Sequence, residues 1–190
     1  MTNITKLIFE WGMLRRVKSE GWRTAGVDIP CSVADHSLRA AQIGYVLACM
    51  ENYKDPNEVC TMLVFHDIGE CRVGDIHKIA ITYINVDEEK AVKDQLAPVS
   101  FGNNILKMWQ EVDYGSSIAG NIAKDADLLE QAFTGKEYSE KGYKYTEDWI
   151  KRVSLKVKTK SAKKLIEEMQ KIHSNEWWQG LKEKIIKEGI

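Results

Sequence analysis

Phe65-His-Asp-Ile-Gly-Glu70 closes an apolar segment and places a histidine beside two carboxylates. Just upstream, Asp55-Pro-Asn-Glu58 combines an N-cap aspartate, a proline in the first turn and a glutamate at N3, which together signal a helix start. Between these stretches the apolar residues recur at helical spacing: Val59, Met62, Leu63 and Phe65. The sequence therefore predicts a helix that begins near Pro56 and ends near Gly69.

Helical periodicity continues on both sides of that segment. Upstream we expect a first amphipathic helix over 4–17, a turn-rich stretch over 21–30 and a second helix over 32–52 that carries His36. Downstream, residues 71–87 show weak periodicity and predict a long loop with short irregular pieces. Further helices are expected over 88–97, 101–111, 116–135, 146–155, 159–173 and 175–187, and Gly135 is expected to end one of them.

The fold class follows from this pattern. No alternation of apolar and polar residues is long enough for a sheet, and the chain has only three prolines to interrupt helices. Its 190 residues match one ordinary domain with a core of its own. We predict an all-α protein, a single compact helical domain over 1–190.

Composition excludes several classes of function. Lysine plus arginine (27) nearly balances aspartate plus glutamate (28), so no overall field favours a nucleic-acid polymer. No stretch approaches the ~20 apolar residues of a membrane span, and the N-terminus lacks the pattern of a signal peptide. No C-x-x-C pair occurs among Cys31, Cys49, Cys60 and Cys71. We expect free thiols in a cytoplasmic protein without a membrane partner.

Histidines and carboxylates suggest the chemistry. His36 lies in the second predicted helix, His66-Asp67 ends the third, and Lys124-Asp-Ala-Asp-Leu-Leu-Glu130 lies in a later one. Imidazole and carboxylate together suit a divalent Mn, Fe, Co, Ni or Zn ion. Glu70 lies one turn beyond His66 and would share its face. Three other readings remain open from the residues alone: a buried core histidine, a helix-capping His-Asp pair and an ordinary paired Asp127.

The ordered set of motifs resembles the HD-domain metal-dependent phosphohydrolases, and within them the 5′-deoxynucleotidase branch of YfbR-like and HDDC2-like proteins. The resemblance rests on Ser32-Val-Ala-Asp-His-Ser37, His66-Asp-Ile-Gly-Glu70, Gly74-Asp75 and Lys124-Asp-Ala-Asp127. It covers residues 5–155 and implies one domain of the HD type. The C-terminal helices over 156–190 are expected to pack on it.

The resemblance implies a site for one divalent metal ion (Co, Mn, Fe, Ni, Zn or Mg) with the ligands His36, His66, Asp67 and Asp127. Asp127, not Asp125, matches the family ligand because Lys124 stands where the family has a lysine. Glu70 matches the acid beside the reacting water, and Asp75 matches a second catalytic carboxylate.

The implied activity is that of a 5′-deoxynucleotidase, which hydrolyses 2′-deoxyribonucleoside 5′-monophosphates to deoxynucleoside and phosphate. Trp22 matches a tryptophan that selects the deoxy sugar. The family's arginine before this tryptophan is missing, and Cys31 stands where glutamate is common. The phosphate contact is therefore left open among the nearby basic residues Arg15, Arg16, Lys18 and Arg23.

Other interpretations differ in the chemistry they require. A non-catalytic nucleotide-binding module would not need Glu70 and Asp75. A two-metal HD enzyme would need more histidines between His66 and Asp127 than His77 alone. An HD phosphohydrolase for another nucleotide or phosphate ester remains an alternative. The resemblance and the six tryptophans lead us to expect a homodimer.

Overall fold

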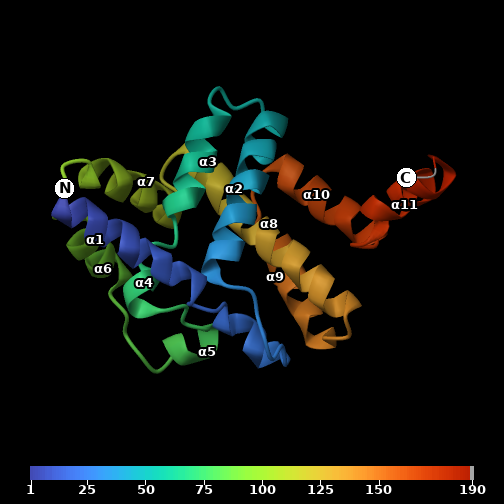
Figure 1. Ribbon diagram of the computed structural model, residues 1–190, viewed down its shortest axis with the longest axis horizontal. Coiled ribbons are helices and arrows are strands. Elements are labelled where there is room, and N and C mark those ends of the chain that lie inside the picture. The colour runs from blue at the N-terminus through green and yellow to red at the C-terminus, as the bar shows by residue number, and fades with distance from the viewer. Residues whose placement is uncertain (189–190) are drawn as a thin grey trace.

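The computed structural model describes residues 1–188, and in them the expected all-α fold is confirmed: helices joined by turns, with no sheet (Figure 1). The α-helices are α1 (Thr2–Trp11), α2 (Val33–Met50), α3 (Pro56–Phe65), α4 (Glu70–Val73), α5 (Lys78–Ile81), α6 (Glu88–Leu96), α7 (Gly102–Tyr114), α8 (Ile118–Glu140), α9 (Glu147–Lys156), α10 (Lys160–Lys171) and α11 (Glu176–Glu188). Short 3₁₀ helices are η1 (Gly12–Arg15), η2 (Glu20–Ala25) and η3 (Lys144–Thr146).

Side-chain caps fix the starts of the helices that carry the site. Ser32 and Asp35 form a capping box at α2, in which each side chain accepts the backbone N–H of the other residue. Asp55 accepts the N–H groups of Asn57 and Glu58 at the start of α3. Ser117 accepts the N–H of Gly120 at the start of α8. These caps hold the first turns of the central helices in place.

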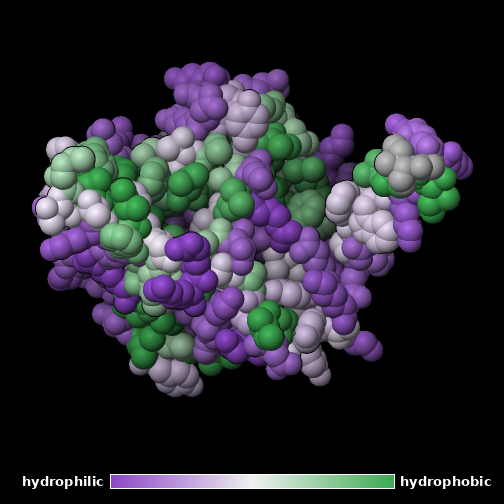
Figure 2. Space-filling model, viewed as in Figure 1, coloured by the Kyte–Doolittle hydropathy of each residue, from purple (hydrophilic) through white to green (hydrophobic). Residues whose placement is uncertain are grey.

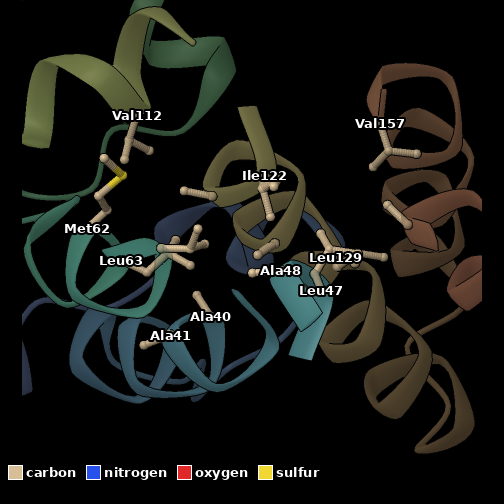
Figure 3. Close-up of a cluster of buried hydrophobic side chains, with 14 of the residues drawn as sticks. Ala40, Ala41, Leu47, Ala48, Met62, Leu63, Val112, Ile122, Leu129 and Val157 are labelled. Carbon is tan, nitrogen blue, oxygen red and sulfur yellow. The ribbon is translucent and has the colours of Figure 1, made fainter. Parts of the chain in front are cut away.

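The main core lies where α2 and α3 pack against α8 (Figure 3). Its buried residues include Ala40, Leu47, Leu63, Ile122 and Leu129. Gly44 permits the close approach of α2 and α3, because a Cβ there would lie 2.2 Å from Leu63 Cδ1. Small residues such as Gly44 therefore set how closely α2 and α3 pack.

A second apolar cluster supports the segment that follows α3. Ile68 is buried there against Leu7 of α1, Val92 of α6 and Trp109 of α7. Packing Ile68 fixes the backbone between His66 and Glu70, and so fixes the directions of the polar side chains on either side of it.

Three helix ends differ clearly from the sequence prediction. The first helix is expected to reach residue 17, but α1 ends at Trp11 and the 3₁₀ helix η1 follows it. α3 ends at Phe65, and residues 66–69 continue as a turn instead of a last helical turn. Gly135 does not end α8, which continues to Glu140. A Cβ at Gly135 would lie 3.2 Å from Thr146 O and 3.5 Å from the Trp22 ring, so this glycine makes room for two packed segments.

The two C-terminal helices behave differently. α10 packs on α8 and buries Ala162, Ile166 and Met169. α11 has no buried residue and projects away from the rest of the chain (Figures 1 and 2). Residues 189–190 lie outside the described residues, and the single domain over 1–190 with packed C-terminal helices stays a prediction.

Among residues 1–188, no helix combines the length and apolar character required to cross a membrane.

Candidate metal centre and substrate cavity

Four polar side chains from three parts of the chain meet at one point. His36 lies near the start of α2, His66 and Asp67 follow α3, and Asp127 lies in the middle of α8. His36 Nε2 is 3.2 Å from His66 Nε2, 3.4 Å from Asp67 Oδ2 and 3.3 Å from Asp127 Oδ1. His66 Nε2 is 3.2 Å from Asp67 Oδ2 and 3.9 Å from Asp127 Oδ1. The structure thus brings together all four residues for which the motifs suggested a ligand role.

The spacing of these atoms fits one divalent ion. Ligand atoms about 2.1 Å from a shared ion, in tetrahedral or octahedral geometry, lie about 3.0–3.4 Å from one another. His36 Nε2, His66 Nε2 and Asp67 Oδ2 lie 3.2–3.4 Å apart, and Asp127 Oδ1 approaches them from α8. The mixed nitrogen and oxygen donors suit the transition metals of intermediate hardness.

Each histidine is oriented by a hydrogen bond at its Nδ1 atom, the ring nitrogen that does not face the cluster. His36 Nδ1 lies 2.5 Å from Glu130 Oε2, and His66 Nδ1 lies 2.8 Å from the carbonyl oxygen of Leu63. An Nδ1–H that donates to these oxygens leaves the Nε2 lone pair of each ring facing the shared point. This tautomer is the one that a metal ligand needs.

Glu130 is itself held in place. Its Oε1 accepts hydrogen bonds from Arg39 Nη2 at 2.8 Å and from Thr134 Oγ1 at 2.7 Å, and its side chain is almost fully buried. Arg39 also binds Glu137, at 2.5 Å. Sequence reasoning did not assign Glu130, although it lies one turn after Asp127 and therefore on the same face of α8.

The side chains of this cluster shift one another's pKa values. Burial disfavours the charged imidazole of His36, but its hydrogen bonds to Asp127 and Glu130 outweigh burial and raise its pKa well above the usual value. A metal ion that binds His36 Nε2 would displace the proton that Nε2 shares with Asp127. Burial also acts to raise the pKa of Asp127, but His36 and the charge of His66 hold that pKa well below its usual range. Asp127 is therefore an ionised carboxylate at neutral pH, the form that binds a cation.

Glu70 and Asp75 lie beside this centre and line the same cavity. Burial, followed by the charges of Asp67 and Asp75, raises the pKa of Glu70 to about 10. Glu70 Oε2 is buried and has no hydrogen-bond partner among the described residues. This oxygen can therefore accept a hydrogen bond from a water molecule or a substrate group. Burial also raises the pKa of Asp75, against the nearby N–H groups of Glu20 and Gly21.

Asp125 and Asp127 point to different parts of the molecule. Asp125 is 1% exposed and accepts the backbone N–H groups of Lys158 and Thr159 at 2.7–3.0 Å. It joins α8 to the turn between α9 and α10. Asp127 faces the histidines, and Lys124 Nζ lies 3.8 Å from its other oxygen.

The metal-ligand cluster lies at the wall of a cavity of about 480 Å³. Trp22 of η2 forms part of another wall, although the side chain is only 4% exposed. Its ring packs against Trp149 at 4.9 Å and edge-on to Tyr138 at 5.4 Å between centroids. Tyr138 Oη also accepts the N–H of Cys31 at 3.0 Å, which fastens the segment after η2 to α8.

The basic residues that sequence reasoning considered for the phosphate contact do not face the cavity lining. Within residues 1–188, none of Arg15, Arg16, Lys18 and Arg23 is part of the cavity lining. Arg23 binds Glu20 at 2.7 Å and the carbonyl oxygen of Asp28 at 3.0 Å. Three cations that the motifs did not single out line the cavity instead: Lys78, Arg152 and Lys156.

Fold and site together define a helical domain with a histidine–aspartate cluster that could hold a metal ion. The family model described as HD domain matches residues 11–173, and the chain belongs to this family.

Characterised relatives and solved structures agree with this assignment. The chain is 31% identical to the 5′-deoxynucleotidase HDDC2 of Homo sapiens over 138 residues, which cover 70% of this chain and 67% of that protein. It is 30% identical to the 5′-deoxynucleotidase HDDC2 of Dictyostelium discoideum, over 73% of this chain and 78% of that protein. A conserved hypothetical protein from Pyrococcus furiosus superposes with a TM-score of 0.75 at 27% identity, covering 88% of this chain and 99% of the other. The resemblance to the 5′-deoxynucleotidase branch is thereby confirmed.

Proposed function

We propose that this protein is a metal-dependent 5′-deoxynucleotidase, which hydrolyses 2′-deoxyribonucleoside 5′-monophosphates to deoxynucleoside and phosphate. The observation that carries the proposal is the ligand set of His36, His66, Asp67 and Asp127 beside the unpartnered Glu70 Oε2, at the wall of a cavity. The relatives named 5′-deoxynucleotidase indicate the substrate class.

One divalent ion held by these four residues would supply Lewis-acid polarisation of a phosphoryl oxygen and a lowered pKa for water. The remaining work falls to side chains of this chain. Glu70 would orient the water that attacks phosphorus and accept its proton. A cation at the neighbouring ligands would counter the charge of Asp67 that helps to raise the Glu70 pKa.

Asp75 would complete the reaction on the other side of phosphorus. The bond between phosphorus and the 5′-oxygen breaks, and the departing oxygen takes a proton as the nucleoside alcohol. Asp75 suits this donation because burial raises its pKa, so more of the carboxyl group is protonated than in a solvated aspartate.

Trp22 supports a preference for the deoxy sugar. Its ring is held rigidly by Trp149 and Tyr138, so it cannot move aside for an added hydroxyl. No sequence motif indicates a dedicated base-reading pocket, and we propose little selection among bases. An indole carbon face also offers no acceptor for a 2′-hydroxyl hydrogen.

The test compares kcat/KM for the deoxy and ribo forms of one 5′-nucleotide, in wild type, Trp22→Phe and Trp22→Ala. Wild type should favour the deoxy form by ~10-fold or more, and Trp22→Ala should lose most of that preference. Trp22→Phe keeps the aromatic packing and controls for local unfolding. Equal values for the two sugars in wild type would contradict the proposed substrate class.

We further propose a cytoplasmic homodimer. All four cysteines are free thiols, as is usual in reducing compartments. Exposed apolar side chains on α11, among them Trp177, Leu181 and Ile186, support a subunit contact. Light scattering at micromolar concentration should give the mass of a dimer, and a monomer mass would contradict the proposal.

A further inference from the structure

The lining of the cavity carries charges of both signs. Asp67, Glu70 and Asp127 line it together with His36. Lys78 begins α5, and Arg152 and Lys156 lie one turn apart on α9, so the two α9 side chains share a face. All three cations line the same cavity as the metal ligands and are exposed to solvent.

These three cations have no carboxylate partner at close range. Within residues 1–188, no carboxylate oxygen lies within 4.0 Å of the charged nitrogens of Lys78, Arg152 or Lys156. Asp148 also lines the cavity, but its ion pair is with Lys151, at 3.8 Å. The cavity therefore holds positive charge that no described side chain neutralises at close range.

The cations also lie close to one another. The neighbouring Lys156 ammonium, followed by burial and the charge of Arg152, lowers the pKa of Lys78 to about 8, while Asp127 acts in the opposite direction. Like charges held together disfavour the folded arrangement unless an anion lies between them. The arrangement is thus complementary to a doubly charged anion that enters the cavity.

We propose that Lys78, Arg152 and Lys156 bind the phosphate group of the substrate, in the cavity that they line together with His36, Asp67 and Asp127. This inference rests on the proposed function, because it identifies the residues that hold the phosphomonoester. The planar guanidinium of Arg152 can donate two parallel hydrogen bonds to phosphate oxygens, and the two lysines add compact point charges. Arg15, Arg16, Lys18 and Arg23 are then not needed for phosphate binding.

The variants Lys78→Met, Arg152→Met and Lys156→Met remove one charge each while keeping an unbranched side chain. Lys151→Met is the matched control, because Lys151 lies on α9 beside Arg152 but is not part of the cavity lining. Arg23→Met tests the competing assignment near Trp22. Inorganic phosphate is the probe, and its Kd is measured by calorimetry on the metal-loaded protein, together with metal content, melting temperature, KM and kcat.

We expect Arg152→Met and Lys156→Met each to weaken phosphate binding and raise KM by ~10-fold. The metal content should stay unchanged, and the melting temperature should not fall, because the changes relieve repulsion between like charges. Lys151→Met and Arg23→Met should stay within ~2-fold of wild type. Phosphate affinity that is unchanged in all three cavity variants, or that falls only in Arg23→Met, would overturn the inference.

Phosphate affinity also separates this inference from the proposed function. If wild type released no phosphate from any nucleotide, the proposed function would fail. A ~10-fold loss of phosphate affinity in Arg152→Met and Lys156→Met would still support a phosphate-binding wall.

Discussion

At the scale of single residues, Glu130 holds His36 in place without belonging to the proposed ligand set. Its carboxylate binds His36 Nδ1 and is itself fixed by Arg39 and Thr134. Such carboxylates keep an imidazole in the tautomer that ligates a metal and increase its basicity. Glu130 is therefore a positioning residue.

We expect Glu130→Gln to weaken metal affinity by ~10–100-fold while the protein stays folded. The measurement is a metal titration of the purified variant, with circular dichroism to check folding. Glu137→Gln is the matched control, because Glu137 binds Arg39 but not His36. Equal metal affinity in Glu130→Gln and wild type would mean that His36 does not depend on Glu130.

Glu70 and Asp75 should behave in the opposite way, since they lie beside the metal ligands and not among them. Glu70→Gln and Asp75→Asn should each retain the metal and lower kcat by ~10²-fold or more, as is typical for lost acid–base groups. Metal analysis and turnover of a deoxynucleotide are measured on the same sample. Near-normal kcat in both variants would place the proton transfers on other groups.

Local sequence indicated candidate ligands but not the groups that support them. His36 and the pair His66-Asp67 each stand in a short motif that can be read from a few neighbouring residues. Glu130 binds His36 across 94 positions, and Lys78 meets Lys156 only after α9 has packed beside α8. Contacts between residues so far apart in the sequence depend on tertiary packing, which the periodicity of apolar residues does not predict.

At the scale of elements, the starts of helices were easier to predict than their ends. Ser32 and Asp55 cap α2 and α3 through backbone groups two or three residues away, so the signal is local. Gly135 read as a helix stop because glycine is common there. In the structure, the missing side chain of Gly135 lets Trp22 and the carbonyl oxygen of Thr146 pack closely against α8. This close approach is seen only in the assembled fold.

Asp125 holds two elements together and should affect stability rather than the metal. It is the buried acceptor for the backbone N–H groups of Lys158 and Thr159 between α9 and α10. Asp125→Ala should lower the free energy of unfolding by about 2–4 kcal/mol, because these N–H groups lose their partner. Urea denaturation measures the loss. Metal affinity should remain that of wild type, and a lost metal with unchanged stability would reverse the roles given to Asp125 and Asp127.

The contact between α1 and α4 predicts a dependence of stability on pH. Arg72 binds Glu10, and this hydrogen bond, with a further one from Gln95, lowers the Glu10 pKa against the effect of burial. A lowered folded-state pKa means that the contribution is present above the unfolded pKa near 4.5 and is lost as pH falls through the folded value.

Glu10→Gln should therefore be less stable than wild type at pH 7 by about 1 kcal/mol or less, because the pair is partly exposed. The difference should shrink when denaturation is repeated at acid pH, below the folded-state pKa of Glu10. A difference that stays constant down to that pH would show that the charge of Glu10 contributes nothing.

At the scale of the whole molecule, two apolar clusters fix the positions of the helices and the turn that carry the site residues. The larger one sets α2 and α3 against α8, and so carries His36 and Asp127 (Figure 3). The smaller one buries Ile68 and so fixes the turn after α3, from which the side chains of His66, Asp67 and Glu70 extend. The all-α class could be predicted from periodicity alone. That α5 and α9 line the same cavity could not, because it depends on how the chain is assembled.

The most direct test of the whole account is phosphate release from a 2′-deoxyribonucleoside 5′-monophosphate by chelated and metal-restored protein, with metal content measured in parallel. The account predicts activity that returns with one divalent ion per chain, and that is absent together with the metal in His66→Ala and Asp67→Ala, because the ligands act as a unit. Full metal occupancy in both variants, or undiminished release by the chelated wild type, would contradict it.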